Sequence, residues 1–174
     1  MSSLMTSIQQ YLPAAAIILL PNLGGVLGGL LTKDAIRKWY TKLKMPALAP
    51  PNWVFGPVWT SIYACMGVSS YLIFKDGGFA AQALPLSVFG AQLLLNWIWS
   101  PIFFGWHRID LALVDIVALW GSIVATMVVF HPINPTAALL LLPHLGWVSF
   151  ATYLNFDFWR LNGRGDQAIK DKDQ

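Results

Sequence analysis

Four long stretches of this chain carry no Lys, Arg, Asp or Glu, and they constrain the fold more than any other feature. They span residues 1–32, 45–74, 77–106 and 116–156. Each is longer than the roughly 20 apolar residues with which an α-helix crosses the hydrocarbon core of a bilayer. Only 11% of the 174 residues are charged, whereas a typical soluble domain has about 25%. We therefore predict an integral membrane protein.

The fourth stretch is about twice as long as one helix requires. It contains His131-Pro132-Ile133-Asn134-Pro135, and this cluster of prolines and asparagine interrupts a helix. The predicted fold class is therefore all-α, a bundle of five transmembrane helices. A β-barrel would show segments of about ten alternating residues, whereas these runs are apolar throughout. The predicted spans are 10–31, 52–74, 84–104, 111–130 and 135–156.

Positive charges gather on one side of this predicted topology. The connections and the tail on that side contain Lys33, Arg37, Lys38, Lys42, Lys44, Arg108, Arg160, Arg164, Lys170 and Lys172. The connections on the opposite side have only Lys75. Because cytosolic segments are enriched in Lys and Arg, we expect the C-terminus in the cytosol and the N-terminus across the membrane. The basic composition then reports orientation and does not indicate a nucleic-acid partner. Residues 1–162 are expected to form one domain, and 163–174 a charged tail.

The first basic connection has two open interpretations. Residues 34–43 place Ile36, Trp39, Tyr40 and Leu43 at helical spacing, which is typical of a short amphipathic helix lying across the cytosolic end of the bundle. The alternative is a basic linker.

Aromatic residues and glycines are candidates for a ligand pocket. Trp59, Trp99 and Trp147 lie well inside predicted spans and suit the wall of a pocket for a flat apolar ligand, although lipid-facing positions would explain them too. Trp53 and Trp106 lie near span ends and suit the membrane–water interface. Gly24, Gly25, Gly28 and Gly29 form two overlapping pairs of small residues on the first span. Such pairs pack helices within a bundle, mediate dimerisation, or leave room for a ligand.

Polar residues within the spans are further candidates. Asn96 and Asp115 are expected to face the bundle interior, where Asp115 could be structural because it lies near a helix start. His144 could ligate a haem iron, but a hydrogen-bonded histidine is favoured. Cys65 is the single cysteine, which excludes an internal disulfide. The sequence has no metal site and no catalytic motif that we can identify, so we do not predict an enzyme.

Several ordered segments resemble the translocator protein family, also called the tryptophan-rich sensory proteins or peripheral benzodiazepine receptors. The segments that carry the resemblance are Pro21-Asn22-Leu23-Gly24-Gly25, Pro50-Pro51-Asn52-Trp53-Val54-Phe55-Gly56-Pro57-Val58-Trp59, Leu95-Asn96-Trp97-Ile98-Trp99-Ser100-Pro101-Ile102-Phe103-Phe104-Gly105, Phe150-Ala151-Thr152 and Trp159-Arg160. Tyr63, Met66-Gly67, Pro143, Trp147 and Leu154-Asn155 add to it, and the resemblance as a whole covers about residues 10 to 162.

The resemblance implies a five-helix bundle, often dimeric, that takes part in tetrapyrrole and sterol transport. Its implied ligands are porphyrins (protoporphyrin IX and haem), cholesterol and benzodiazepine-type compounds, with no required cofactor. The implied ligand-binding residues are Gly29, Phe55, Trp59, Asn96, Phe104, Trp147, Ala151 and Leu154. Ser87 and Ala91 occupy the spacing of the family's dimer contact, and Tyr153, Phe156 and Arg160 lie in the region of its sterol motif.

Two departures and two alternatives accompany this resemblance. His144 stands where family members commonly have Tyr, and Tyr153 is too far from Arg160 for a strict sterol motif. The segments 74–79 and 133–138 look more like animal than bacterial members, which favours the mitochondrial outer membrane over a bacterial membrane. The alternative functions are porphyrin breakdown that uses the pocket tryptophans, and a structural scaffold that recruits partners.

Overall fold

The computed structural model describes residues 2–165, and these residues contain helices and connections but no strand. The helices are α1 (Ser2–Lys38), α2 (Asn52–Phe74), α3 (Gly78–Ala81), α4 (Ala83–Ser100), α5 (Ile109–Phe130), α6 (Pro135–Leu139) and α7 (Leu142–Asn162). A 3₁₀ turn, η1 (Tyr40–Lys42), and a π-helical turn, η2 (Pro101–Gly105), complete the secondary structure. Most of the predicted charged tail, including Lys170 and Lys172, lies outside the described residues.

Five helical segments are long and apolar enough to cross a membrane. They are Ala14–Lys38, Asn52–Phe74, Ala83–Gly105, Ile109–Phe130 and Pro135–Asn162. Large apolar side chains such as Leu19, Leu27, Val114 and Val128 are more than half exposed on the outside of the bundle. Such a surface is stable against lipid tails and unfavourable in water. The predicted all-α, five-span membrane fold is confirmed.

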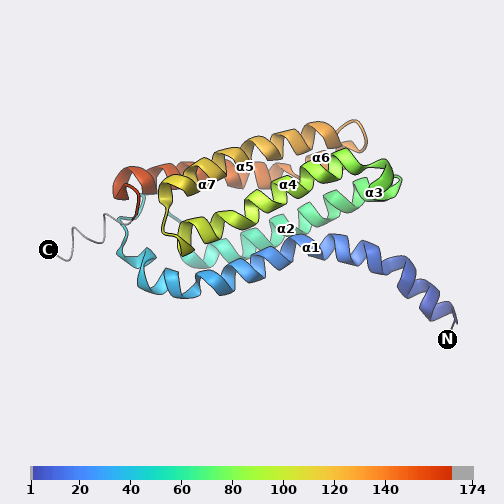
Figure 1. Ribbon diagram of the computed structural model, residues 1–174, viewed down its shortest axis with the longest axis horizontal. Coiled ribbons are helices and arrows are strands. Elements are labelled where there is room, and N and C mark those ends of the chain that lie inside the picture. The colour runs from blue at the N-terminus through green and yellow to red at the C-terminus, as the bar shows by residue number, and fades with distance from the viewer. Residues whose placement is uncertain (1, 166–174) are drawn as a thin grey trace.

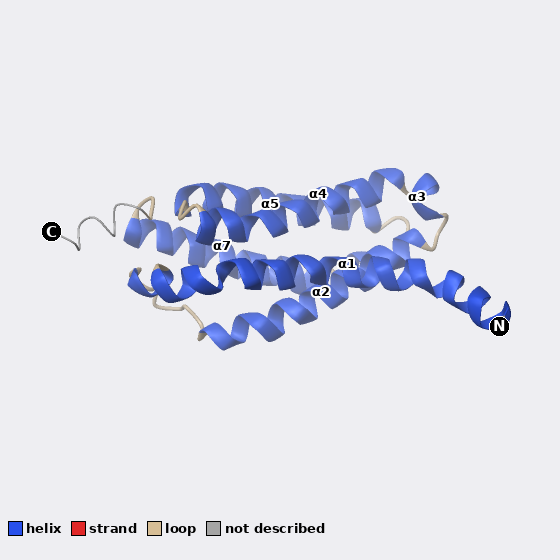
Figure 2. Ribbon diagram, turned by 60° about the horizontal axis from the view of Figure 1, so that its bottom comes forward, coloured by secondary structure: helices blue, strands red, loops and turns tan. Residues whose placement is uncertain are grey.

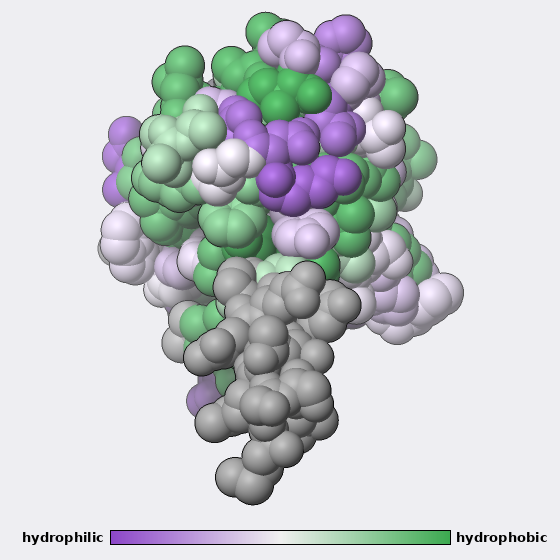
Figure 3. Space-filling model, turned by 90° about the vertical axis from the view of Figure 1, so that its right-hand side faces the viewer, coloured by the Kyte–Doolittle hydropathy of each residue, from purple (hydrophilic) through white to green (hydrophobic). Residues whose placement is uncertain are grey.

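The spans run side by side along the long axis of the molecule, and the two ends of the chain lie at opposite ends of it (Figure 1). This placement is what an odd number of spans requires. Helix α1 packs on α2, while α5 packs on both α4 and α7, so that α1 and α2 form one side of the bundle in Figure 2 and the other spans form the opposite side. Figure 3 looks onto the end that carries α3, where polar atoms gather in a compact patch among apolar ones. This end includes the exposed residues Lys75, Asp76 and His131.

The connection between the first two spans is neither a separate amphipathic helix nor a plain basic linker. Residues 34–38 continue α1, and the chain then turns through η1. Trp39, Tyr40 and Leu43 are buried at one end of the bundle, in a cluster with Phe103 and Phe158. The helical spacing therefore arises from the last turns of α1 and a short turn, and its apolar side chains do cover the end of the bundle.

Prolines set two boundaries that the sequence analysis placed differently. The predicted span 84–104 is α4 followed by η2, which begins at Pro101 and holds a Trp106 N–H to Pro101 C=O bond of 2.9 Å. The predicted span 135–156 is α6 followed by α7, with Pro143 in the first turn of α7. Because proline has no N–H to donate to the preceding turn, the helix ends at Leu139 and begins again at Leu142.

Candidate functional site

An internal cavity of about 420 Å³ lies between the spans, within the size range of small-molecule sites. Side chains from α1, α2, α4, α5 and α7 line it, and Tyr40 of η1 and Phe104 of η2 also reach it. All eight residues predicted to bind a ligand line this one cavity: Gly29, Phe55, Trp59, Asn96, Phe104, Trp147, Ala151 and Leu154. The structure thus brings together residues that are up to 125 positions apart (154 minus 29); their role in binding stays a prediction.

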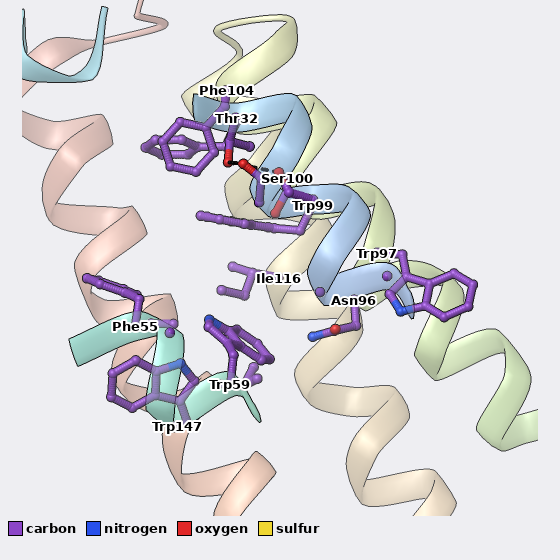
Figure 4. Close-up of a pocket in the computed structure, with 18 of the residues that line it drawn as sticks. Thr32, Phe55, Trp59, Asn96, Trp97, Trp99, Ser100, Phe104, Ile116 and Trp147 are labelled. Carbon is purple, nitrogen blue, oxygen red and sulfur yellow. Dashed lines mark hydrogen bonds between the residues drawn. The ribbon is translucent and has the colours of Figure 1, made fainter. Parts of the chain in front are cut away.

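Aromatic rings form one wall of the cavity. Phe55 and Trp147 meet edge to face, with ring centroids 5.7 Å apart. Trp59 stacks on Tyr63 at 5.4 Å. Figure 4 shows Phe55, Trp59 and Trp147 grouped on one side of the space, with Ile116 between this group and Trp99. Fixed rings of this kind offer broad apolar faces to a planar ligand.

The opposite end of the cavity is held by a hydrogen-bonded corner. The Trp99 indole N–H donates to Asn155 Oδ1 at 3.0 Å, and Asn155 Nδ2 donates to the Ile109 carbonyl at 3.0 Å. Trp99 also stacks on Phe103, with centroids 4.9 Å apart. Burial raises the pKa of the nearby Tyr40 phenol above its ordinary value, so this side chain stays neutral. The corner joins α4, α5 and α7 and fixes this end of the cavity.

The glycines of α1 serve two of the three purposes that the sequence left open. The indole of Trp97 lies against Gly24, where a Cβ would clash with it. A Cβ on Gly25 would approach the Tyr63 ring to 2.6 Å. At Gly29 nothing lies within 4 Å of the Cβ position, and the residue opens onto the cavity. The glycine face therefore packs α1 onto the bundle at Gly24 and Gly25 and leaves room at Gly29.

Two indole N–H groups of residues that line the cavity lack a hydrogen-bond partner in the described part of the chain. The indole nitrogens of Trp97 and Trp147 are buried and have no hydrogen-bond partner among residues 2–165. Both side chains line the cavity. Asn96 adds a carboxamide whose oxygen accepts a 2.8 Å hydrogen bond from the Tyr63 hydroxyl. A largely apolar cavity with a few polar groups is the usual composition of a site for small apolar molecules.

Other predicted residues lie elsewhere. Tyr153, Phe156 and Arg160 are exposed on α7 and do not line the cavity. Ser87 and Ala91 are exposed on the outer side of α4. His144 is buried but does not line the cavity, and its ring lies near two carboxamides instead of facing the ligand space.

Asp115 is the remaining polar candidate within the spans. Asp115 is buried, and its Oδ2 has no hydrogen-bond partner within the described part of the chain. No group of three His, Cys, Asp or Glu side chains with metal-binding geometry occurs among residues 2–165.

Some cavity residues were not identified from the sequence as site residues. Tyr63 contributes its ring, and Thr32 and Ser100 contribute hydroxyls near Phe104 (Figure 4). Tyr63 belongs to the residues that carry the family resemblance but was not predicted to bind a ligand, and its position one helical turn after Trp59 is the signal that could have placed it in the site.

The fold and the cavity together define a multi-span helical membrane protein with a mostly apolar cavity between its spans. The chain belongs to the TspO/MBR family, whose sequence profile matches residues 17–160. It is 43% identical over 154 residues to the human translocator protein, covering 87% of this chain and 91% of that one. The bovine translocator protein is 42% identical over the same coverage. The tryptophan-rich protein TspO of the archaeon Archaeoglobus fulgidus is 40% identical over 139 residues, which cover 79% of this chain and 89% of the relative.

Proposed function

We propose that this protein binds porphyrins, with protoporphyrin IX and haem as ligands, and cholesterol, in the cavity between its spans, and takes part in tetrapyrrole and sterol transport. The observation that carries the proposal is the aromatic wall of Phe55, Trp59 and Trp147 inside a cavity of about 420 Å³. A planar macrocycle gains dispersion and apolar burial against such rings. The name "Translocator protein" of the mammalian relatives supports a transport role.

The same cavity is proposed to accept benzodiazepine-type compounds, which are aromatic, largely apolar and carry hydrogen-bond acceptors. The unpartnered indole N–H of Trp147 supports this, because a buried donor gains from an acceptor on the ligand. No cofactor is required for such binding.

The setting proposed for this activity is the mitochondrial outer membrane, with the basic end of the bundle in the cytosol. The basic residues of 33–44 support the orientation, and the mammalian relatives support a eukaryotic membrane. An archaeal relative shows that the family also occurs outside mitochondria, so a bacterial membrane is the alternative. We also propose a homodimer, formed through the exposed α4 face that carries Ser87 and Ala91.

The binding proposal is tested by titrating the purified protein with protoporphyrin IX and recording the porphyrin absorbance, which does not depend on tryptophan emission. The double variant Trp59→Phe/Trp147→Phe removes two indoles from the wall. We expect affinity to fall about tenfold or more, because each phenyl ring is smaller than the indole that it replaces, buries less apolar surface against the ligand and has no N–H donor. The matched control is Trp53→Phe/Trp106→Phe, since both side chains are exposed and neither lines the cavity. Equal affinity of the two double variants would contradict the proposed site.

A second candidate function is oxidative breakdown of the bound porphyrin under light. It is favoured by the position of Trp59, which lines the cavity and stacks on Tyr63. Two oxidisable aromatic rings would therefore lie next to a ligand in the cavity. Prolonged illumination of the complex in air distinguishes the two functions. Recovery of intact porphyrin supports binding and transport alone, whereas new product absorbance that needs Trp59 supports breakdown.

A further inference from the structure

A line of buried polar side chains extends from the cavity into the bundle. Its members are Tyr63 of α2, Asn96 and Gln92 of α4, and His144 of α7, and none is more than 7% exposed. Tyr63 and Asn96 line the cavity, whereas Gln92 and His144 lie behind it. Polar groups at membrane depth are unfavourable unless they are paired. The pairing of these four groups therefore decides which of their hydrogen atoms face the cavity.

The contacts follow in sequence along this line. The Tyr63 hydroxyl donates to Asn96 Oδ1 at 2.8 Å. Asn96 Nδ2 lies 3.4 Å from His144 Nε2, and the other ring nitrogen, Nδ1, lies 3.3 Å from Gln92 Nε2. The edge of the imidazole also packs against Trp59, with ring centroids 6.0 Å apart. His144 is thus held from three sides.

The chemistry of a neutral imidazole fixes the direction of these bonds. One ring nitrogen donates and the other accepts, yet a carboxamide nitrogen, which only donates, lies beside each of them. A half-turn of the Gln92 carboxamide resolves this, because it brings Oε1 to Nδ1 and moves Nε2 to the present position of Oε1, which is buried with no partner among the described residues. Every step then joins a donor to an acceptor, in the order Tyr63, Asn96, His144, Gln92. Turning Asn96 instead would leave Gln92 Oε1 unpaired and deprive the Tyr63 hydroxyl of its acceptor.

We propose that His144 is a positioning residue that sets the polarity of the cavity. By accepting one hydrogen of Asn96 Nδ2, it holds the carboxamide with its oxygen on Tyr63 and its second N–H available to a ligand. Figure 4 shows the Asn96 carboxamide reaching toward the space beside Trp59. The protein then selects, among flat apolar molecules, those with a carbonyl or carboxylate oxygen at this position. This inference rests on the proposed function of the cavity.

The test compares fluorenone with fluorene, two flat tricyclic probes that differ by one carbonyl oxygen and have no hydrogen-bond donor. The measured quantity is the ratio of the fluorene Kd to the fluorenone Kd, from quenching of tryptophan emission in one detergent. Each probe partitions into detergent to the same extent for every variant, so this contribution cancels when the ratio is compared between variants. We expect Asn96→Leu and His144→Phe each to lower the ratio about fivefold, the effect of one net neutral hydrogen bond.

Three further variants separate positioning from folding. His144→Gln keeps an acceptor near the Nε2 position and should retain the wild-type ratio. Gln92→Met removes the partner of Nδ1, frees the imidazole to change tautomer, and should lower the ratio even if His144→Phe does not fold. Trp53→Phe, which is exposed and outside the cavity, should leave it unchanged.

The outcomes are distinguishable from failure of the proposed function. If Asn96→Leu lowers the ratio while His144→Phe and Gln92→Met both leave it unchanged, the positioning role of His144 is overturned. A ratio that Asn96→Leu leaves unchanged would overturn Asn96 as the donor. If the wild-type protein bound neither probe nor protoporphyrin IX, the proposed function would fail together with this inference.

Discussion

At Gly67 the backbones of α1 and α2 meet directly. A Cβ placed on this glycine would clash with the carbonyl oxygen and Cα of Ile18. Close approach of small residues is the main way in which helices associate where lipid removes the hydrophobic driving force. Gly67 is fully enclosed within the bundle, so neither helix can move aside without losing packing elsewhere.

We therefore expect Gly67→Ala to lower the free energy of unfolding by about 1–3 kcal/mol, as overpacking does in close-packed interiors. The apparent melting temperature in detergent should fall by about 2–12 °C for a chain of this size. Gly121→Ala is the matched control, because it lies within α5 with nothing within 4 Å of the added methyl. An equal melting temperature for both variants would show that the approach of α1 to α2 is not limiting.

At the residue scale, the sequence predicted residues of the cavity wall but not the buried polar contacts behind that wall. The residues Trp59, Asn96 and Trp147 could be predicted because they belong to motifs that resemble a known family. The pairing of Gln92 and Asn96 with His144 could not, because it joins residues 52 and 48 positions apart. Such a contact depends on how α4 and α7 are rotated about their own axes. A segment that is apolar on all sides does not indicate which face points inward.

At the scale of elements, one side chain ties the first connection to the end of α7. Asn162 Oδ1 accepts from the Lys44 backbone N–H at 2.8 Å, and its Nδ2 donates to the Lys44 carbonyl at 3.0 Å. Asn162 is buried and also bonds the Phe158 carbonyl at 3.0 Å. The connection thereby covers the end of the cavity at which Tyr40 lies.

Asn162→Leu should release this connection while leaving the spans intact. We expect the Lys44 amide to exchange its hydrogen about tenfold faster or more, since about 1 kcal/mol is lost for each hydrogen bond. Hydrogen exchange followed by mass spectrometry measures this on the peptide that contains Lys44. Thr41→Ala serves as the control, because its hydroxyl bonds only the Arg37 carbonyl one turn earlier. Unchanged exchange in Asn162→Leu would mean that the aromatic cluster alone holds the connection.

The existence and number of the spans could be predicted, but several of their boundaries could not. Helix α1 begins at Ser2 and continues to Lys38, whereas the predicted span was 10–31. A span prediction ends where charged residues begin, but backbone hydrogen bonds continue through Lys33 and Arg37 because these side chains are compatible with a helix. Pro143 was visible in the sequence, and its effect on α7 was missed because the apolar run continues across it.

At the scale of the whole molecule, the five spans form the walls of one cavity, which is the proposed binding site. The exposed apolar side chains face lipid, and the cavity gathers residues from all five spans. Membrane insertion and the shape of the cavity are therefore linked, because the packing of helices that satisfies the backbone in lipid also sets the distance between Trp59 and Trp147. Orientation followed from charge alone and stays a prediction, since helix packing is the same whichever end faces the cytosol.

The account depends on the cavity being the place where a planar apolar ligand binds. The most direct measurement is a structure of the protein in lipid nanodiscs with protoporphyrin IX added. We expect the macrocycle between the spans, with its faces against the rings of Trp59 and Trp147 and its edge near Ala151. Porphyrin bound on the outer, lipid-facing surface, with those two indoles distant from it, would contradict the account.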